Sequence, residues 1–129
     1  MKRKILVADD DADNRIIARA ILEASGYDVV EAKDGEEAMA AVFSERPDAL
    51  LLDLSMPKIN GWEVARQLRE KPSVSHMPII AFTAHAIIGD ELKAKAAGCD
   101  DYISKPCAPI EVLNKIKKWL PGGPEAKPE

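Results

Sequence analysis

The chain has 129 residues, of which 47% are hydrophobic and 31% are charged, and its formal net charge is −4. This length and composition predict one globular domain with an ordinary apolar core, and the negative charge gives no general basis for binding nucleic acid or an anionic membrane. No apolar run approaches the roughly 20 residues of a membrane span, and the first residues lead into a strand-like run rather than a signal peptide. We therefore expect a cytoplasmic protein without nucleic-acid or membrane partners, in which Cys99 and Cys107 are reduced.

Five short apolar runs alternate with segments of helical periodicity. The strand-like runs span residues 4–8, 27–31, 49–52, 78–82 and 101–103. In the first helical segment, apolar residues recur at helical spacing, and Gly26 is placed to end the helix; these residues are Ile16, Ile17, Ala20, Ile21 and Ala24. Asp34 is placed to cap the second helix, with Glu37 as its capping-box partner, and Pro47 marks the exit.

The remaining helices are expected at residues 61–70, 88–97 and 110–120. Gly98 is placed to end the fourth helix, and Pro109 suits the first turn of the fifth. Strand and helix alternation of this kind predicts a (βα)5 domain of the α/β class, with a doubly wound parallel sheet and helices on both faces. We assign residues 1–120 to this domain and expect residues 121–129, a polar segment with three prolines, to be a disordered tail.

Acidic residues directly follow two of the expected strands. Asp9 and Asp10 come after residues 4–8, and Asp53 closes the run 49–52. Two like charges about 5 Å apart repel by roughly 3 kcal/mol at an effective dielectric of about 20, so such a pair beside a buried strand favours a bound cation. Oxygen ligands of this kind suit Mg²⁺. Helix capping is the structural alternative, and it accounts for Asp11 or Asp13 but not for the cluster at the strand ends.

A hydroxyl and an ammonium group follow two other strands. Thr83 comes after the run 78–82, and Lys105 comes after residues 101–104. A carboxylate beside Mg²⁺ can act as a nucleophile towards a phosphoryl group, and that reaction further needs a cation and a hydrogen-bond donor. Each residue alone has an ordinary alternative as a solvated charge or a strand-end side chain. A cis Lys105–Pro106 bond is one way of aiming the ammonium group inward.

Five motifs in this order resemble the receiver domain of bacterial two-component response regulators, over nearly the whole chain from Lys2 to Leu120. They are Ile5-Leu-Val-Ala-Asp-Asp10, Leu52-Asp-Leu-Ser-Met-Pro57, the following Gly61, Phe82-Thr-Ala84, and Gly98 through Asp-Asp-Tyr-Ile-Ser-Lys-Pro106. The resemblance implies a flavodoxin-like receiver fold with the strand order 2-1-3-4-5. It also implies a phosphorylation-activated signalling switch rather than a metabolic enzyme.

Residue roles also follow from the resemblance. Asp53 would be the phosphoacceptor. Asp10 would bind Mg²⁺ directly, Asp9 would act mainly through water, and the backbone carbonyl of Ser55 would complete the protein ligands.

The resemblance assigns three further residues. Lys105 would contact the phosphoryl group, and Thr83 would move to bond it. Tyr102 matches the switch aromatic that turns inward when Thr83 shifts; the alternative is an amphipathic surface aromatic.

The implied phosphoryl donor is a phosphohistidine of a histidine kinase or of a histidine phosphotransfer protein. We expect it to dock on the outer stripe of the first helix, formed by Asn14, Arg15, Ala18, Arg19 and Leu22, although Arg15 and Arg19 could be plain solvated charges. The output face towards an unknown protein target would comprise Ala86, Ile87, Ile88, Tyr102 and residues 108–111. The resemblance leaves open a monomer or a weak dimer.

Three alternatives to a stand-alone receiver remain. The nearest is a receiver excised from a hybrid histidine kinase or a larger regulator, although the initiator Met and polar tail favour a complete chain. A Mg²⁺-dependent aspartyl-phosphate phosphohydrolase would need a second Asp two residues after the nucleophile, where this chain has Ser55. A flavodoxin-like FMN binder would need a phosphate loop after the first strand, where this chain is acidic.

Overall fold

Five strands and five helices alternate in the computed structural model, which describes residues 2–54, 56, 60–83, 90–104 and 109–124. The strands are β1 (Lys4–Ala8), β2 (Asp28–Ala32), β3 (Ala49–Asp53), β4 (Ile79–Thr83) and β5 (Asp101–Ser104). The helices are α1 (Ala12–Ala24), α2 (Gly35–Glu45), α3 (Gly61–Arg69), α4 (Asp90–Ala97) and α5 (Pro109–Trp119). The predicted (βα)5 pattern is confirmed, with element ends displaced by one or two residues.

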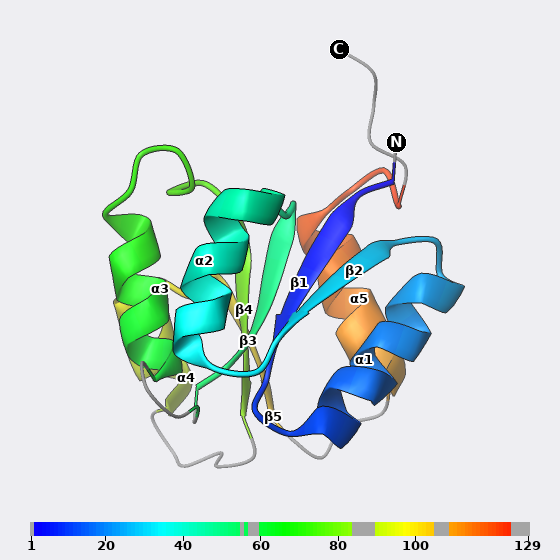
Figure 1. The fold of residues 1–129 in the computed structure, drawn as a ribbon, viewed down its shortest axis with the longest axis horizontal. Coiled ribbons are helices and arrows are strands. Elements are labelled where there is room, and N and C mark those ends of the chain that lie inside the picture. The colour runs from blue at the N-terminus through cyan, green and yellow to red at the C-terminus, as the bar shows by residue number, and fades with distance from the viewer. Residues whose placement is uncertain (1, 55, 57–59, 84–89, 105–108, 125–129) are drawn as a thin grey trace.

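The strands form one parallel sheet in the order β2-β1-β3-β4-β5, as predicted. Helices α1 and α5 cover one face, and α2, α3 and α4 cover the other (Figure 1). Successive residues of a strand point to opposite faces, so Leu50 and Leu52 join one core cluster while Leu51 joins the other. Burial on both faces explains why the central strands are continuous apolar runs.

Local signals set the helix ends. The side chains of Asp11, Asp34 and Asn60 accept hydrogen bonds from backbone N–H groups in the first turns of α1, α2 and α3. Gly26 and Gly98 have φ angles of 98° and 114°, in the left-handed region that glycine adopts without a steric penalty. They follow α1 and α4, as the sequence predicted.

Helix α1 faces the sheet with a different side from the one predicted. Ala18 and Leu22, assigned from the sequence to an outer docking stripe, are buried in the core against the sheet. Ile16 and Ile17 are instead 61% and 56% exposed. The prediction was wrong because apolar residues occupy more than one side of this helix, so helical spacing alone does not identify the buried side.

The N-terminal ends of the strands lie at the edge of the sheet opposite to Asp9 and Asp53. There the backbone N–H of Arg3 donates to the carbonyl of Pro124 at 2.6 Å. The remainder of the predicted disordered tail, residues 125–129, lies outside the described residues.

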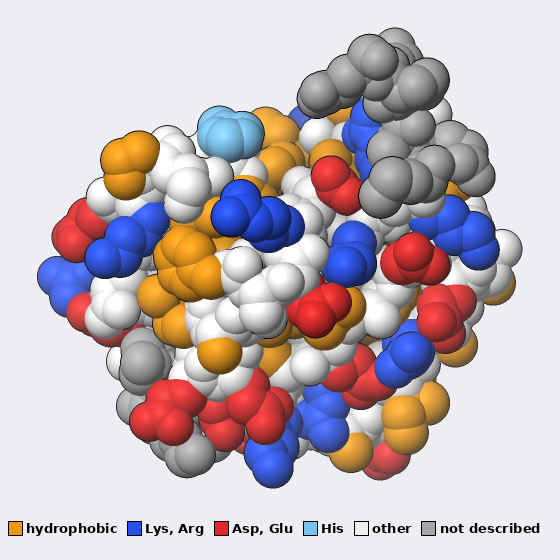
Figure 2. Space-filling view, turned by 45° about the horizontal axis from the view of Figure 1, so that its top comes forward, with side chains coloured by type: hydrophobic (Ala, Val, Ile, Leu, Met, Phe, Trp, Pro, Cys, Tyr) orange, Lys and Arg blue, Asp and Glu red, His pale blue; other side chains and the backbone are white. Residues whose placement is uncertain are grey.

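On the face in Figure 2, Lys and Arg side chains are interspersed with Asp and Glu, without a continuous basic patch among the residues described there. Within the described ranges, no helix is both long and apolar enough to cross a bilayer.

Candidate functional site

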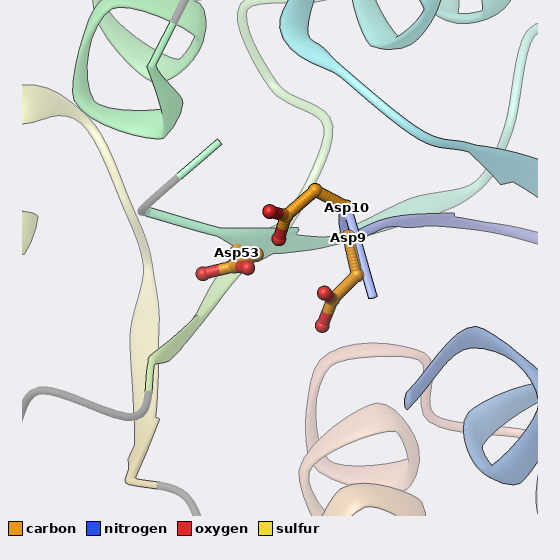
Figure 3. Close-up of side chains that lie close together, drawn as sticks. All are labelled: Asp9, Asp10 and Asp53. Carbon is orange, nitrogen blue, oxygen red and sulfur yellow. The ribbon is translucent and has the colours of Figure 1, made fainter. Parts of the chain in front are cut away.

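Three carboxyl groups meet at the C-terminal edge of the sheet. Ala8 of β1 pairs with Leu52 of β3, so the residues that follow them, Asp9 and Asp53, stand at the same level. Asp10 extends the group, and carboxylate oxygens of the three residues lie within 4.8 Å of one another (Figure 3). Asp9 and Asp53 are only 2% and 6% exposed, whereas Asp10 is exposed. The structure therefore brings together the three acidic residues that the sequence singled out.

Backbone hydrogen bonds fix the segment between β1 and α1. The N–H of Asp9 donates to the carbonyl of Ala32 at 3.0 Å and so extends the pairing with β2. The N–H of Asp11 donates to Oδ1 of Asp9 at 2.9 Å, while the Asp11 side chain caps α1. These bonds leave a very short connection in which Asp9 and Asp10 have little freedom to separate from Asp53.

Gly61 allows α3 to approach the end of β3. Its N–H donates to the carbonyl of Leu54 at 3.1 Å. A Cβ atom at Gly61 would lie 2.3 Å from the carbonyl oxygen of Asp53 and 2.6 Å from the Cα of Leu54. A side chain cannot be placed there without moving the backbone beside Asp53, so glycine is a structural requirement of this edge.

The acidic cluster fits a hard divalent cation. At 4.8 Å two carboxylates repel by about 3.5 kcal/mol at an effective dielectric of about 20, and the cluster contains three such pairs. Two of the carboxyl groups are also withdrawn from water, which weakens solvent screening of their charge. All candidate ligand atoms are oxygens, the atoms that Mg²⁺ prefers in proteins.

The other predicted site residues are described only in part. Thr83 is the last residue of β4, and its backbone pairs with Ser104, the last residue of β5. These strand ends lie beside that of β3, because Phe82 pairs with Asp53. Ser55 and Lys105 lie outside the described residues. Tyr102 is partly buried on β5, where it packs against the core on the α2–α3–α4 side.

The sequence did not reveal the part played by Arg15. Its Nη1 atom donates to the backbone carbonyl of Asp9 at 2.7 Å, and its Nε atom pairs with Oε1 of Glu31 at 3.1 Å. Arg15 is thus bonded to a member of the acidic cluster rather than presented as a simple surface charge. The only available signal was its position one turn into the helix that follows Asp9 and Asp10.

A second missed residue, Asp101, lies at the opposite end of β5. It is 6% exposed and accepts hydrogen bonds from Lys115 Nζ and Trp119 Nε1, both at 2.8 Å, and from the N–H of Tyr102. Burial alone would raise the pKa of this carboxyl group, but the bonds from Lys115, Trp119 and the Tyr102 backbone outweigh it and lower the pKa to about 2. Asp101 therefore fastens α5 to β5.

Comparison with known proteins agrees with the fold. The polar-differentiation response regulator DivK of Brucella anthropi is 35% identical over 120 residues, which cover 93% of this chain and 98% of that protein. The crystal structure of a putative response regulator from Chloroflexus aurantiacus has a TM-score of 0.89 and 32% identity, covering 93% of this chain and 98% of that one.

The chemotaxis response regulator CheY4 of Vibrio cholerae has a TM-score of 0.87 at 28% identity, covering 93% of this chain and all of that one. Residues 5–117 match the family described as the response regulator receiver domain. The chain belongs to the response regulator receiver domain family, and it is a phosphorylation-activated signalling switch of the DivK and CheY type.

Proposed function

We propose that Asp53 is the phosphoacceptor of this switch and that Asp9, Asp10 and Asp53 hold the Mg²⁺ needed for its phosphorylation. The observation that carries the proposal is the meeting of three carboxylates within 4.8 Å at the end of β1 and β3. The backbone carbonyl of Ser55 is proposed as a further ligand. When bound, Mg²⁺ supplies positive charge that offsets the charge of the phosphoryl oxygens.

The phosphoryl donor is proposed to be a phosphohistidine of a histidine kinase or phosphotransfer protein. An oxygen of Asp53 forms a bond to phosphorus while the phosphorus–nitrogen bond of the donor breaks. The electron pair stays on the imidazole nitrogen, which takes up a proton, and Asp53 becomes an acyl phosphate. Water later attacks phosphorus, releases phosphate and restores the carboxylate. The activity is therefore self-directed.

Two residues at neighbouring strand ends, together with Tyr102 within β5, serve the phosphorylated state in this proposal. Lys105, which follows Ser104 in the chain, provides an ammonium group for the phosphoryl oxygens, and Thr83 provides a hydroxyl hydrogen bond. Tyr102 responds to the shift of Thr83 by changing its side-chain position. The adjacency of the backbone ends of β3, β4 and β5 supports the grouping of Thr83 and Lys105 with Asp53.

The donor protein is proposed to dock on the exposed side of α1. Ile16 and Ile17 are exposed apolar residues close to the acidic edge, because they lie in the second turn of the helix that follows Asp10. This surface replaces the stripe predicted from the sequence, in which Ala18 and Leu22 are buried. Two exposed adjacent isoleucines are suited to burial in an interface with a helix bundle.

Output is proposed to run through the surface of β5 and α5. A groove there is lined by residues that include Tyr102, Ser104, Glu111 and Lys115. Tyr102 thus lines this groove and is also the proposed switch residue. Ala86, Ile87, Ile88 and Ala108 of the predicted output face lie outside the described residues. A cytoplasmic monomer or weak dimer that signals to a protein target completes the proposal.

A small-molecule phosphodonor tests the phosphoacceptor chemistry. Purified chain is incubated with phosphoramidate, with Mg²⁺ or with a chelator, and intact mass is recorded. Asp53→Asn is compared with Asp28→Asn, a matched change at an exposed carboxyl group on β2. We expect one Mg²⁺-dependent phosphoryl adduct on the wild type and on Asp28→Asn, and none on Asp53→Asn. A folded wild type that gains no adduct would overturn the proposal.

A further inference from the structure

The guanidinium group of Arg15 joins three elements beside the acidic cluster. It extends from α1, donates from Nη1 to the backbone carbonyl of Asp9 at 2.7 Å, and pairs through Nε with Glu31 of β2 at 3.1 Å. Its side chain is only 17% exposed. A planar guanidinium with several fixed donors can hold two acceptors at once, which a single ammonium group does less well.

The bond to Asp9 matters because the carboxylates of the cluster repel one another. Three carboxylates held within 4.8 Å repel one another, and without a cation the favourable response is for the chain to move them apart. Asp9 and Asp10 lie on the connection between β1 and α1, so they can move only if this connection moves. Arg15 restrains it by linking the carbonyl of Asp9 to β2 through Glu31.

We propose that Arg15 is a positioning residue for the divalent cation: it holds the Asp9 backbone so that the three carboxylates stay at binding distance. The inference rests on the proposed function, since it takes this cluster to be the Mg²⁺ site. Arg15 touches neither the cation nor the phosphoryl group in this arrangement. It acts through the backbone of a ligand residue, as outer partners of metal sites do.

If Arg15 positions the carboxylates, its removal changes the Mg²⁺ affinity in the opposite direction from the one expected if only its charge acts. A positive charge beside a cation site repels the cation, so loss of the charge alone would strengthen Mg²⁺ binding. Loss of a positioning bond would weaken it, because the relaxed carboxylates must be drawn together again when the cation binds. The sign of the change in affinity therefore separates the two roles.

Arg19 provides a matched control on the same helix. Its Nη1 atom pairs with the other oxygen of Glu31 at 2.6 Å, and its Nε atom pairs with Glu23 at 3.2 Å. Arg19→Gln thus removes the same charge and a bond to the same Glu31 partner. The bonds described for Arg19 lead to Glu31 and Glu23, whereas those of Arg15 reach the Asp9 backbone.

The test is isothermal titration calorimetry of the full chain with MgCl₂, with thermal unfolding recorded for each variant. We expect Arg15→Gln to bind Mg²⁺ about tenfold more weakly than the wild type. Arg19→Gln should bind Mg²⁺ within about twofold of the wild type, or more tightly, because a positive charge is lost. The Mg²⁺ affinity of Arg15→Lys should lie between those of the two glutamine variants. This variant keeps the test valid if Arg15→Gln is unfolded.

Two results would overturn the inference. Equal affinities of Arg15→Gln and Arg19→Gln would show that only charge matters, and tighter binding by Arg15→Gln would show the opposite of positioning. A wild-type chain that binds no Mg²⁺ while folded would instead overturn the proposed function and the inference with it. These failures are distinguishable because the first two require a wild type that binds normally.

Discussion

The buried carboxyl group of Asp101 makes the acid stability of this domain predictable. Asp101 accepts hydrogen bonds from Lys115 and Trp119 at 2.8 Å, and Lys118 Nζ lies 3.5 Å away. All three partners belong to the last turns of α5. Replacing Asp101 by Asn preserves the shape of the side chain but removes the charge that these donors share.

The expected magnitude follows from the pKa of Asp101. This pKa is lowered from an ordinary value of 3.8 to about 2, a difference that corresponds to roughly 2 kcal/mol of stability at neutral pH. Because the folded-state pKa is depressed, the contribution is fully present well above pH 3.8 and is lost as pH falls towards 2. At pH 3 about half of this contribution remains.

Urea unfolding at pH 7 and at pH 3 measures the effect. We expect Asp101→Asn to lower the free energy of unfolding by roughly 2 kcal/mol at pH 7 and by about half as much at pH 3. Asp28→Asn, an equal change at an exposed carboxyl group, should alter it by less than about 0.5 kcal/mol at either pH. A penalty for Asp101→Asn that stays constant or grows between pH 7 and pH 3 would refute the reasoning.

Three other substitutions test separate parts of the account. Tyr27 is 1% exposed and its hydroxyl has no hydrogen-bond partner among the described residues, so Tyr27→Phe should raise the free energy of unfolding by about 1 kcal/mol, and a decrease would contradict this. Gly61→Ala should lower it by roughly 1–3 kcal/mol, because its Cβ would overlap the Asp53 backbone; unchanged urea unfolding would count against that contact. Ile17→Glu should slow phosphorylation by a phosphohistidine protein at least tenfold and leave phosphorylation by phosphoramidate unchanged. Leu92→Glu, at an exposed apolar residue on α4, is its control, and equal slowing by both variants would contradict docking on α1.

Most of the fold could be predicted because the sequence signals were local. Each strand is a short apolar run, and parallel sheets covered on both faces require such runs. Asp34, Gly26 and Gly98 marked helix ends through side-chain capping or a positive φ angle, both of which depend on neighbouring residues only. The acidic cluster could be predicted from the strands, because residues that follow parallel strands meet at one edge of the sheet.

The features that were missed depend on contacts between distant parts of the chain. Helix α1 has apolar residues on several sides, so only packing against the sheet decides that Leu22 is buried and Ile17 is exposed. Arg15 bonds to Glu31, 16 residues away, and Asp101 bonds to Trp119, 18 residues away. Charged residues on a helix are usually solvated, and nothing in the local sequence distinguishes these pairs from ordinary surface charges.

The residue that carries the phosphoryl group can be identified chemically, and we expect it to be Asp53. Protein phosphorylated by phosphoramidate in Mg²⁺ is reduced with borohydride, which converts an aspartyl phosphate to homoserine, and is then digested and sequenced by mass spectrometry. We expect homoserine at position 53 and nowhere else. Homoserine at position 9 or 10, or a phosphoryl group on a residue outside the acidic cluster, would contradict it.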